Sequence, residues 1–112
     1  MSLPEEGCLL RVFIGESDKH AGRPLYEWIV PQAREAGLAG TTVLRGIMGF
    51  GANSRQIQTF KIERLSEDLP IVVEVVDTKE NLERFLETIE DGITAGLVTL
   101  EKAQIRFYRG GK

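Results

Sequence analysis

The sequence predicts an α+β fold, a βαββαβ sandwich in which a four-stranded antiparallel sheet carries two helices on one face. Segments that alternate between apolar and polar residues, typical of strands, take turns along the chain with two segments of helical periodicity. Their order is β-α-β-β-α-β. Right-handed crossovers in this order put both helices on the same side of the sheet, which is the ferredoxin-like arrangement.

The first strand and first helix are expected on either side of a polar loop. Leu10, Val12 and Ile14 alternate with their neighbours within Gly7–Gly15, as in a strand. The loop Glu16–His20 follows, and Arg23-Pro24 opens a helix, with Pro24 expected at the first helical position. Gly37 is expected to cap the end of this helix. Pro31 falls in its interior, where proline removes a hydrogen bond, so we expect a kink or two short helices.

The second strand is expected over residues 41–50, although it contains two glycines, which weaken strands and mark bulges or close approaches. A loop of small and polar residues, 51–57, follows it. Residues 58–65 are ambiguous and are interpreted as a short strand returning from a long hairpin. The turn 66–70 leads out of this segment.

The second half of the chain repeats the alternation. Ile71–Val76 is the clearest strand, and Asp77 or Thr78 can cap the helix that follows. Apolar residues within 82–89 recur at helical spacing. After a loop over 90–96, the stretches 97–100 and 103–108 are expected as closing strands.

Length and composition indicate one domain without affinity for nucleic acid. The chain has 112 residues, so we expect a single domain over residues 8–112 after an N-terminal extension, 1–7, that resembles a tag scar. A net charge of −3 does not favour nucleic acid or anionic lipid. We find no apolar run long enough to span a membrane and no secretory signal, so we expect no membrane insertion and a cytoplasmic location.

The chain offers few residues for metal or covalent chemistry. A single cysteine, Cys8, excludes an internal disulfide and a multi-cysteine metal site. A single histidine, His20, makes a histidine-rich metal site improbable. We therefore predict no metal and assign no catalytic residues.

The strand Ile71–Val76 is apolar on both sides except for Glu74. A strand of this kind needs cover on both faces of its sheet, and the two helices cover only one. We therefore expect the chain to self-associate through the other face, and Glu74 to pair with an arginine on that face.

Glycines and arginines around the end of the second strand are the candidate ligand site. Gly46, Gly49 and Gly51 could let a ligand approach the backbone, whose N–H groups bind anions, or they could only relieve strain where the hairpin leaves the sheet. Arg45 and Arg55 could pair with phosphate or carboxylate, or could be ordinary surface charges. Arg45 is the stronger candidate because a charge within a strand needs a partner.

Several segments resemble a family of unknown function found in bacteria and archaea, the uncharacterised protein family 166, or domain-of-unknown-function 190 family. The matching segments are Gly15–His20, Gly22–Tyr26, Gly37–Gly40, Thr42–Gly51 and Leu65–Asp77. The resemblance extends over nearly the whole chain, and residues 45–51 are its most specific part. This family is in turn similar to the PII signal-transduction proteins.

The PII resemblance implies a homotrimer whose sheets face the three-fold axis, with ligand clefts between subunits and a flexible loop after the second strand. The ligand in PII proteins is usually an adenine nucleotide, and the loop docks on transporters or enzymes. Together with the residue chemistry above, this gives the predicted ligand-binding residues Arg45, Gly46, Gly49, Phe50, Gly51, Arg55 and Arg106, of which Arg106 is the possible counterpart of a basic residue on the last strand of PII proteins. The predicted partner loop is Ala52, Asn53, Ser54, Arg55 and Gln56. Asp91–Gly96 lacks the basic residue that contacts phosphate in PII proteins, which argues against phosphate binding there.

The sequence supports three alternative hypotheses of function. The leading hypothesis is a PII-like regulatory protein that binds a small anionic metabolite between subunits. The second is a small oligomeric enzyme in which His20, with Asp18 and Glu16, supplies acid–base chemistry, although a lone histidine is more often structural. The third is an RNA-binding module, which the absence of aromatic residues in 71–76 disfavours.

Overall fold

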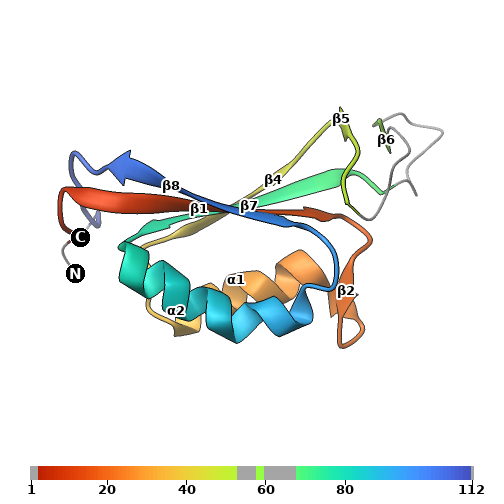
Figure 1. The fold of residues 1–112 in the computed structure, drawn as a ribbon, viewed down its shortest axis with the longest axis horizontal. Coiled ribbons are helices and arrows are strands. Elements are labelled where there is room, and N and C mark those ends of the chain that lie inside the picture. The colour runs from red at the N-terminus through yellow and green to blue at the C-terminus, as the bar shows by residue number, and fades with distance from the viewer. Residues whose placement is uncertain (1–2, 53–57, 60–67, 112) are drawn as a thin grey trace.

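The computed structural model describes residues 3–52, 58–59 and 68–111, and it has the predicted α+β ferredoxin-like fold. Four antiparallel strands form one layer in the order β4-β7-β1-β8, and two helices form the other layer beneath it (Figure 1). The elements of the two layers are β1 (Glu6–Gly15), α1 (Leu25–Glu35), β4 (Thr41–Arg45), β7 (Pro70–Asp77), α2 (Lys79–Ile89) and β8 (Leu97–Gln104).

Two short hairpins and one 3₁₀ turn are the other elements in the described residues. Lys19–His20 (β2) pairs with Arg23–Pro24 (β3), so part of the expected loop is a small hairpin. Met48–Gly49 (β5) pairs with Gln58–Thr59 (β6), and the turn η2 spans Glu90–Gly92. The pairing of β5 with β6 confirms the returning strand for two residues of the ambiguous segment; residues 60–67 lie outside the described residues.

The hydrophobic core lies between the sheet and the two helices. Alternate residues of β1 and β7 point toward the helices, which turn one apolar side toward them. The buried core side chains of these four elements are Cys8, Leu10, Val12, Ile14, Leu25, Ile29, Ala33, Ile71, Val73, Val75, Leu82, Phe85 and Ile89. This packing fixes which face of the sheet remains for function.

Helix α1 begins one residue later than expected and runs unbroken through Pro31. Pro24 has an extended ψ of 135° because it still pairs in β3, and the helix starts after it. Pro31 lies on the exposed side of α1, where water can reach the carbonyl that its missing N–H leaves unpaired. Gly37 has a positive φ of 76°, and Leu38 N–H donates to the Ala33 carbonyl at 3.2 Å. This arrangement is a Schellman cap, as expected.

The expected strand over residues 41–50 is not continuous, since β4 covers Thr41–Arg45 and only Met48–Gly49 of the remainder is strand, as β5 in a separate hairpin. Strand β4 ends at Arg45, and the chain then turns over Pro70. The Gly46 N–H donates to the Pro70 carbonyl at 2.7 Å, and a Cβ on Gly46 would lie 2.7 Å from Pro70 Cγ. Only glycine allows this close approach, so the strand breaks where its first glycine occurs.

The junction between β7 and α2 is built on Asp77 and Thr78. Thr78 is the N-cap, and its hydroxyl accepts a hydrogen bond from Asn81 N–H at 3.1 Å. Asp77 is fully buried, and its carboxylate accepts from the N–H groups of Thr78 and Ala39 and from the Asn81 side-chain amide. The buried carboxylate therefore ties the start of α2 to the loop before β4.

The closing strand is also shorter than expected at its end. β8 runs continuously to Gln104, whereas residues 105–108 leave the sheet. Ile105 N–H still donates to the Glu5 carbonyl at 2.7 Å, and the Tyr108 hydroxyl donates to the Ala39 carbonyl at 2.6 Å. The first of these bonds extends the β1–β8 pairing by one step, and the second holds the chain after β8 beside the loop before β4.

Candidate functional site

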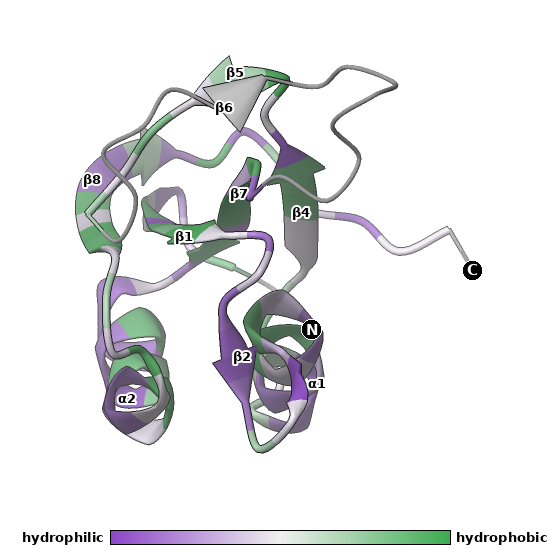
Figure 2. Cartoon of the chain, turned by 90° about the vertical axis from the view of Figure 1, so that its right-hand side faces the viewer, coloured by the Kyte–Doolittle hydropathy of each residue, from purple (hydrophilic) through white to green (hydrophobic). Residues whose placement is uncertain are grey.

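The sheet face opposite the helices, here called the free face, has no cover within the described part of the chain. Both helices lie on one side of the sheet, and the short strand β5 lies on the other (Figure 2). By register and alternation, the free face carries Leu9, Arg11, Phe13, Thr42, Leu44, Val72, Glu74, Val76, Leu97, Thr99 and Glu101. Leu44 is 48% exposed and Leu97 is 56% exposed, which is unusual for large apolar side chains in a sheet.

The charged side chains at the centre of the free face form ion pairs, and Glu74 has the arginine partner that the sequence predicts. Arg11 Nε lies 2.9 Å from Glu74 Oε2, and Arg11 Nη1 lies 2.5 Å from Glu101 Oε1. Hydrogen bonding to Glu74 is the main cause that raises the pKa of the Arg11 guanidinium above its usual value. The arginine is therefore charged throughout the pH range of a folded protein.

A cavity of about 420 Å³ opens at the edge of the free face, where β1 ends and β8 begins. Its floor comes from the sheet, and its other walls come from the segment after β5 and the loop before β8. The described lining residues are Phe13, Ile14, Gly15, Asp18, Gly49, Phe50, Gly51, Ala52, Asp68, Pro70, Ala95, Gly96 and Leu97. Apolar walls with exposed backbone are typical of sites that bind small organic ligands.

Close backbone contacts shape this cavity. A Cβ on Gly96 would lie 2.8 Å from the Phe13 carbonyl oxygen, so the loop before β8 sits directly on β1. A Cβ on Gly49 would lie 3.1 Å from Pro70 Cγ, which places the β5 strand over the start of β7. In contrast, a Cβ on Gly51 would meet nothing within 4 Å. The glycines at 49 and 96 therefore serve packing, and Gly51 leaves space open at the cavity wall.

The described lining is acidic. Asp18 Oδ2 accepts from Gly15 N–H at 2.9 Å, and Asp68 Oδ1 accepts from Ser17 N–H at 2.7 Å. No lysine or arginine is found among the lining residues that the structure describes. A phosphate at this place would therefore need a cation from another part of the chain or from another subunit.

The structure brings together part of the predicted ligand site. Gly49, Phe50 and Gly51 line the cavity, and so does Ala52, the first residue of the predicted partner loop. Gly46 contacts Pro70 from just outside the lining. The predicted residues Asn53, Ser54, Arg55 and Gln56 lie outside the described residues.

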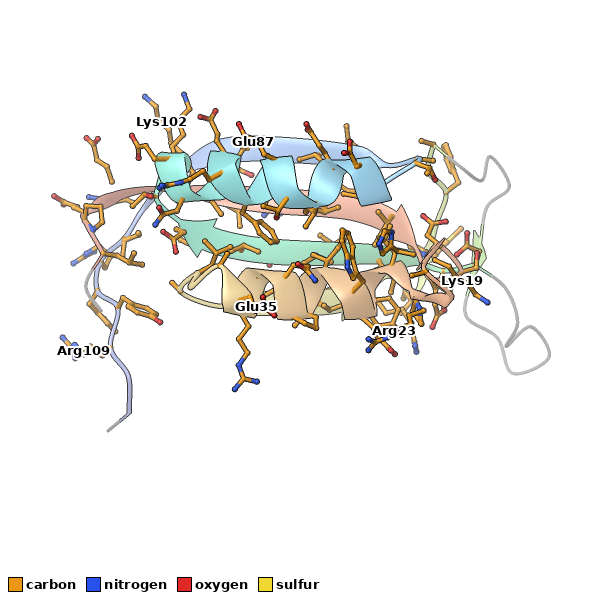
Figure 3. The ribbon with its side chains drawn as sticks, turned by 90° about the horizontal axis from the view of Figure 1, so that it is seen from below. Lys19, Arg23, Glu35, Glu87, Lys102 and Arg109 are labelled. Atoms are coloured by element: carbon orange, nitrogen blue, oxygen red, sulfur yellow. The ribbon has the colours of Figure 1, made fainter. Side chains whose placement is uncertain are left out.

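Two predicted arginines lie elsewhere in the protomer. Arg45 pairs with Glu16 through Nη2 and Oε2 at 2.5 Å, so it has the partner that a strand arginine needs. Arg106 follows the far end of β8, roughly 25 Å from the cavity at about 3.3 Å per strand residue. Figure 3 shows the nearby Arg109 at the end of the molecule opposite Lys19 and Arg23. Arg106 could reach a cavity only on another copy of the chain.

Sequence reasoning missed several lining residues. Asp18 and Asp68 are separated by 50 positions, and only the fold brings both beside Gly15. Phe13 and Leu97 are opposite each other in the β1–β8 register, so their pairing depends on strand order. Among the lining residues before β8, only Gly96 indicated in the sequence that two backbone segments come close together, here the loop before β8 and β1.

The three residues of the enzyme hypothesis, His20, Asp18 and Glu16, each contact a different part of the protein. The His20 ring packs against Trp28, with ring centroids 4.0 Å apart. Asp18 accepts from the Gly15 backbone, whereas Glu16 pairs with Arg45. Packing against Trp28 agrees with the structural role that a lone histidine more often has.

The described residues contain neither a cluster of metal-ligating side chains nor a membrane-spanning helix. Across 3–52, 58–59 and 68–111, no group of three or more His, Cys, Asp or Glu side chains could hold a metal ion. Neither described α-helix is long and apolar enough to cross a membrane.

The sequence of this chain is similar to one family of proteins over most of its length. The model of the DUF190 family, described as "Uncharacterized ACR", matches residues 7–105. A UPF0166 protein of Aquifex aeolicus is 41% identical over 87% of this chain and 90% of its own length. A UPF0166 protein of Methanocaldococcus jannaschii is 34% identical over 91% of this chain and 92% of its own length.

Solved structures share the fold at low sequence identity. CPII, a nitrogen regulatory PII-like protein from Thiomonas intermedia K12 bound to ADP, AMP and bicarbonate, matches with a TM-score of 0.66 at 17% identity. The match covers 89% of this chain and 88% of CPII. The apo form of CPII matches with a TM-score of 0.59 at 17% identity, covering 89% of this chain and 91% of that chain. At such identity the likeness shows the PII-like fold.

Proposed function

The chain belongs to the DUF190 family of uncharacterised proteins, and we propose that it is a PII-like regulatory protein that binds an adenine nucleotide in clefts between subunits. The observation that carries this proposal is the cavity beside Gly49–Ala52, at the start of the segment predicted to contact partners. CPII shares the fold and is bound to ADP and AMP, which supports the choice of ligand.

The cavity suits the base of a nucleotide better than its phosphates. Phe13, Pro70 and Leu97 supply apolar surface for a planar ring, and the backbone at Gly51 is accessible for hydrogen bonds. The acids Asp18 and Asp68 disfavour a highly charged phosphate chain. We therefore expect tighter binding of AMP and ADP than of ATP.

Self-association is part of the same proposal. The free face carries large exposed apolar side chains, and the cavity opens at its edge, so a second copy on this face would form a further wall. A closed ring of three copies, as in the PII resemblance, would also bring Arg106 of one copy toward the cavity of another. That arginine would supply the cation missing from the described lining.

Signalling would pass through the residues after the cavity wall. Gly51 and Ala52 line the cavity, so a bound ligand would contact the chain immediately before Asn53. We propose that this contact changes the affinity of the following segment for a protein partner, such as a transporter or an enzyme.

Calorimetry on the purified protein tests the ligand. AMP, ADP, ATP and GDP are titrated separately, and we expect AMP and ADP to bind, ATP to bind more weakly and GDP weakest. Gly51→Val fills the open space at the cavity wall and should weaken ADP binding at least about 10-fold. Gly40→Val is the matched control because Gly40 also has open space beside it and does not line the cavity. Absence of ADP binding at millimolar concentration by the assembled protein would contradict the proposal.

A further inference from the structure

The centre of the free face holds a charged cluster that joins three strands. Arg11 on β1 lies directly opposite Glu74 on β7, and Glu101 on β8 lies opposite Leu9, two residues along β1. The guanidinium contacts both carboxylates, at 2.9 Å from Glu74 and 2.5 Å from Glu101. One central arginine therefore holds a carboxylate from each neighbouring strand.

Apolar side chains flank this cluster on both sides. One row crosses all four strands of the sheet beside the cavity, and a shorter pair lies on the other side of the cluster. The row consists of Leu44, Val72, Phe13 and Leu97, and the pair consists of Leu9 and Val76. The cluster is thus a polar island in a largely apolar face.

We expect these charges to contribute little to the folding stability of a single chain. They lie on the face away from the helices, and solvent-exposed ion pairs add little to folding stability. Their pairing matters once another surface covers the face, because buried charges must be fully paired. The cluster therefore has its greatest effect in an interface.

The charge of the cluster favours a particular occupant. One cation and two carboxylates leave one net negative charge, and Glu101 is 56% exposed against 29% for Glu74. Glu101 is thus the carboxylate that faces an incoming surface. That negative charge repels anionic lipid and nucleic acid. Another copy of this chain presents both signs of charge at the centre of its free face, so it can place its Arg11 beside Glu101 of the first copy in one particular arrangement.

We propose that Arg11, Glu74 and Glu101 set the orientation of the interface between copies of this chain, with Arg11 of one copy beside Glu101 of the next. This inference rests on the self-association within the proposed function and adds the residues that determine its geometry. The apolar row supplies contact area in many orientations. A copy shifted along the strands would bury Glu101 against apolar side chains, so the cluster selects one arrangement.

Sedimentation equilibrium over a dilution series tests this inference. Arg11→Ala leaves two carboxylates without their cation in the interface and should raise the dissociation constant at least about 100-fold. Lys102→Ala is the matched control, since Lys102 lies on the same sheet, opposite Cys8 and on the helix side, and its dissociation constant should match the wild type. Circular dichroism checks that each variant is folded.

A triple variant separates orientation from simple attraction. Arg11→Gln, Glu74→Gln and Glu101→Gln together remove all three charges and keep polar side chains of similar size. We expect this protein to assemble but with several stoichiometries in place of one. Because the triple variant leaves no unpaired charge, it still tests the role of the cluster if Arg11→Ala does not fold.

The outcomes distinguish this inference from the proposed function. If the wild-type chain is a folded monomer at micromolar concentration, self-association fails and this inference fails with it. If the wild type assembles and Arg11→Ala assembles equally well, only the role of the cluster is overturned. A triple variant with the wild-type stoichiometry alone would also overturn it.

Discussion

The two faces of the sheet are built from the same strands and similar residues, yet their surroundings differ completely. On β7, Val73 and Val75 point toward the helices and are 0% and 1% exposed. Val76, the next residue on the same strand, points to the free face and is 36% exposed. The difference arises from the two helices, which cover one face alone (Figure 1).

This contrast shows that the apolar residues on the two sides of a strand can serve different purposes, folding of the chain on one side and association on the other. The helix side is satisfied within one chain and provides the free energy of folding. The free face keeps apolar area and a charge cluster that folding of one chain does not use. Substitutions on the two faces should therefore affect different measurements, unfolding for one and association for the other.

The largest expected effect is on the covered face. Phe85→Ala removes a side chain that is 1% exposed, and large-to-small core changes of this kind cost about 3–5 kcal/mol. Urea unfolding monitored by circular dichroism measures this loss. Leu44→Ala on the free face is the comparison, and its effect on the unfolding of the monomer should be far smaller. Similar losses from both would remove the distinction between the faces.

The next largest effect concerns the buried carboxylate at the end of β7. Asp77→Ala leaves buried donors unpaired, each worth roughly 1–3 kcal/mol, so we expect a loss of about 3 kcal/mol. Asp77→Asn keeps an acceptor oxygen and should lose less. Thermal unfolding of both variants checks this order, and equal stability of Asp77→Ala and the wild type would contradict it.

A smaller effect is expected where the chain crosses from the sheet to the cavity wall. Gly46→Ala places a Cβ 2.7 Å from Pro70 Cγ, and overpacking of this kind costs about 1–3 kcal/mol. Gly51→Ala meets nothing within 4 Å and should leave stability nearly unchanged. Chemical denaturation of the pair shows whether glycine is needed at position 46 for the close approach. Equal midpoints would show that it is not.

The smallest effect on unfolding is expected on the free face. Leu44→Ser removes a side chain that is 48% exposed, so its unfolding free energy as a monomer should change by less than about 0.5 kcal/mol. Its dissociation constant should rise instead, because the apolar row lies in the proposed interface. Light scattering on a dilution series measures this change. An unchanged oligomer would separate the apolar row from self-association.

Prediction of the elements succeeded where a local signal was strong. The strand Ile71–Val76, the amphipathic helix after it and the Gly37 cap are all present. The strand over residues 41–50 was predicted too long because contact with Pro70, a residue distant in sequence, breaks it at Gly46. The last strand was also predicted too long, because β8 ends at Gln104 and the Tyr108 hydroxyl instead bonds to the Ala39 carbonyl, a contact distant in sequence.

The candidate ligand site stays a prediction, and the structure shows only which of its residues lie together. The glycines at 49 and 51 signalled a place of close approach, and both line the cavity. The acids Asp18 and Asp68 carried no such signal, because an exposed loop aspartate is common in any protein. Arg45 needed a partner, as expected, but the identity of that partner as Glu16 depended on the fold.

The sequence by itself determined the order of the main elements and led to the expectation that the second face of the sheet is covered. Both depend on the spacing of apolar residues along the chain, which requires no knowledge of neighbours. Only the tertiary structure decided which face the helices cover, which residues surround the cavity and which carboxylates Arg11 holds. Those depend on strand order and register, and these bring side chains together across tens of residues of sequence.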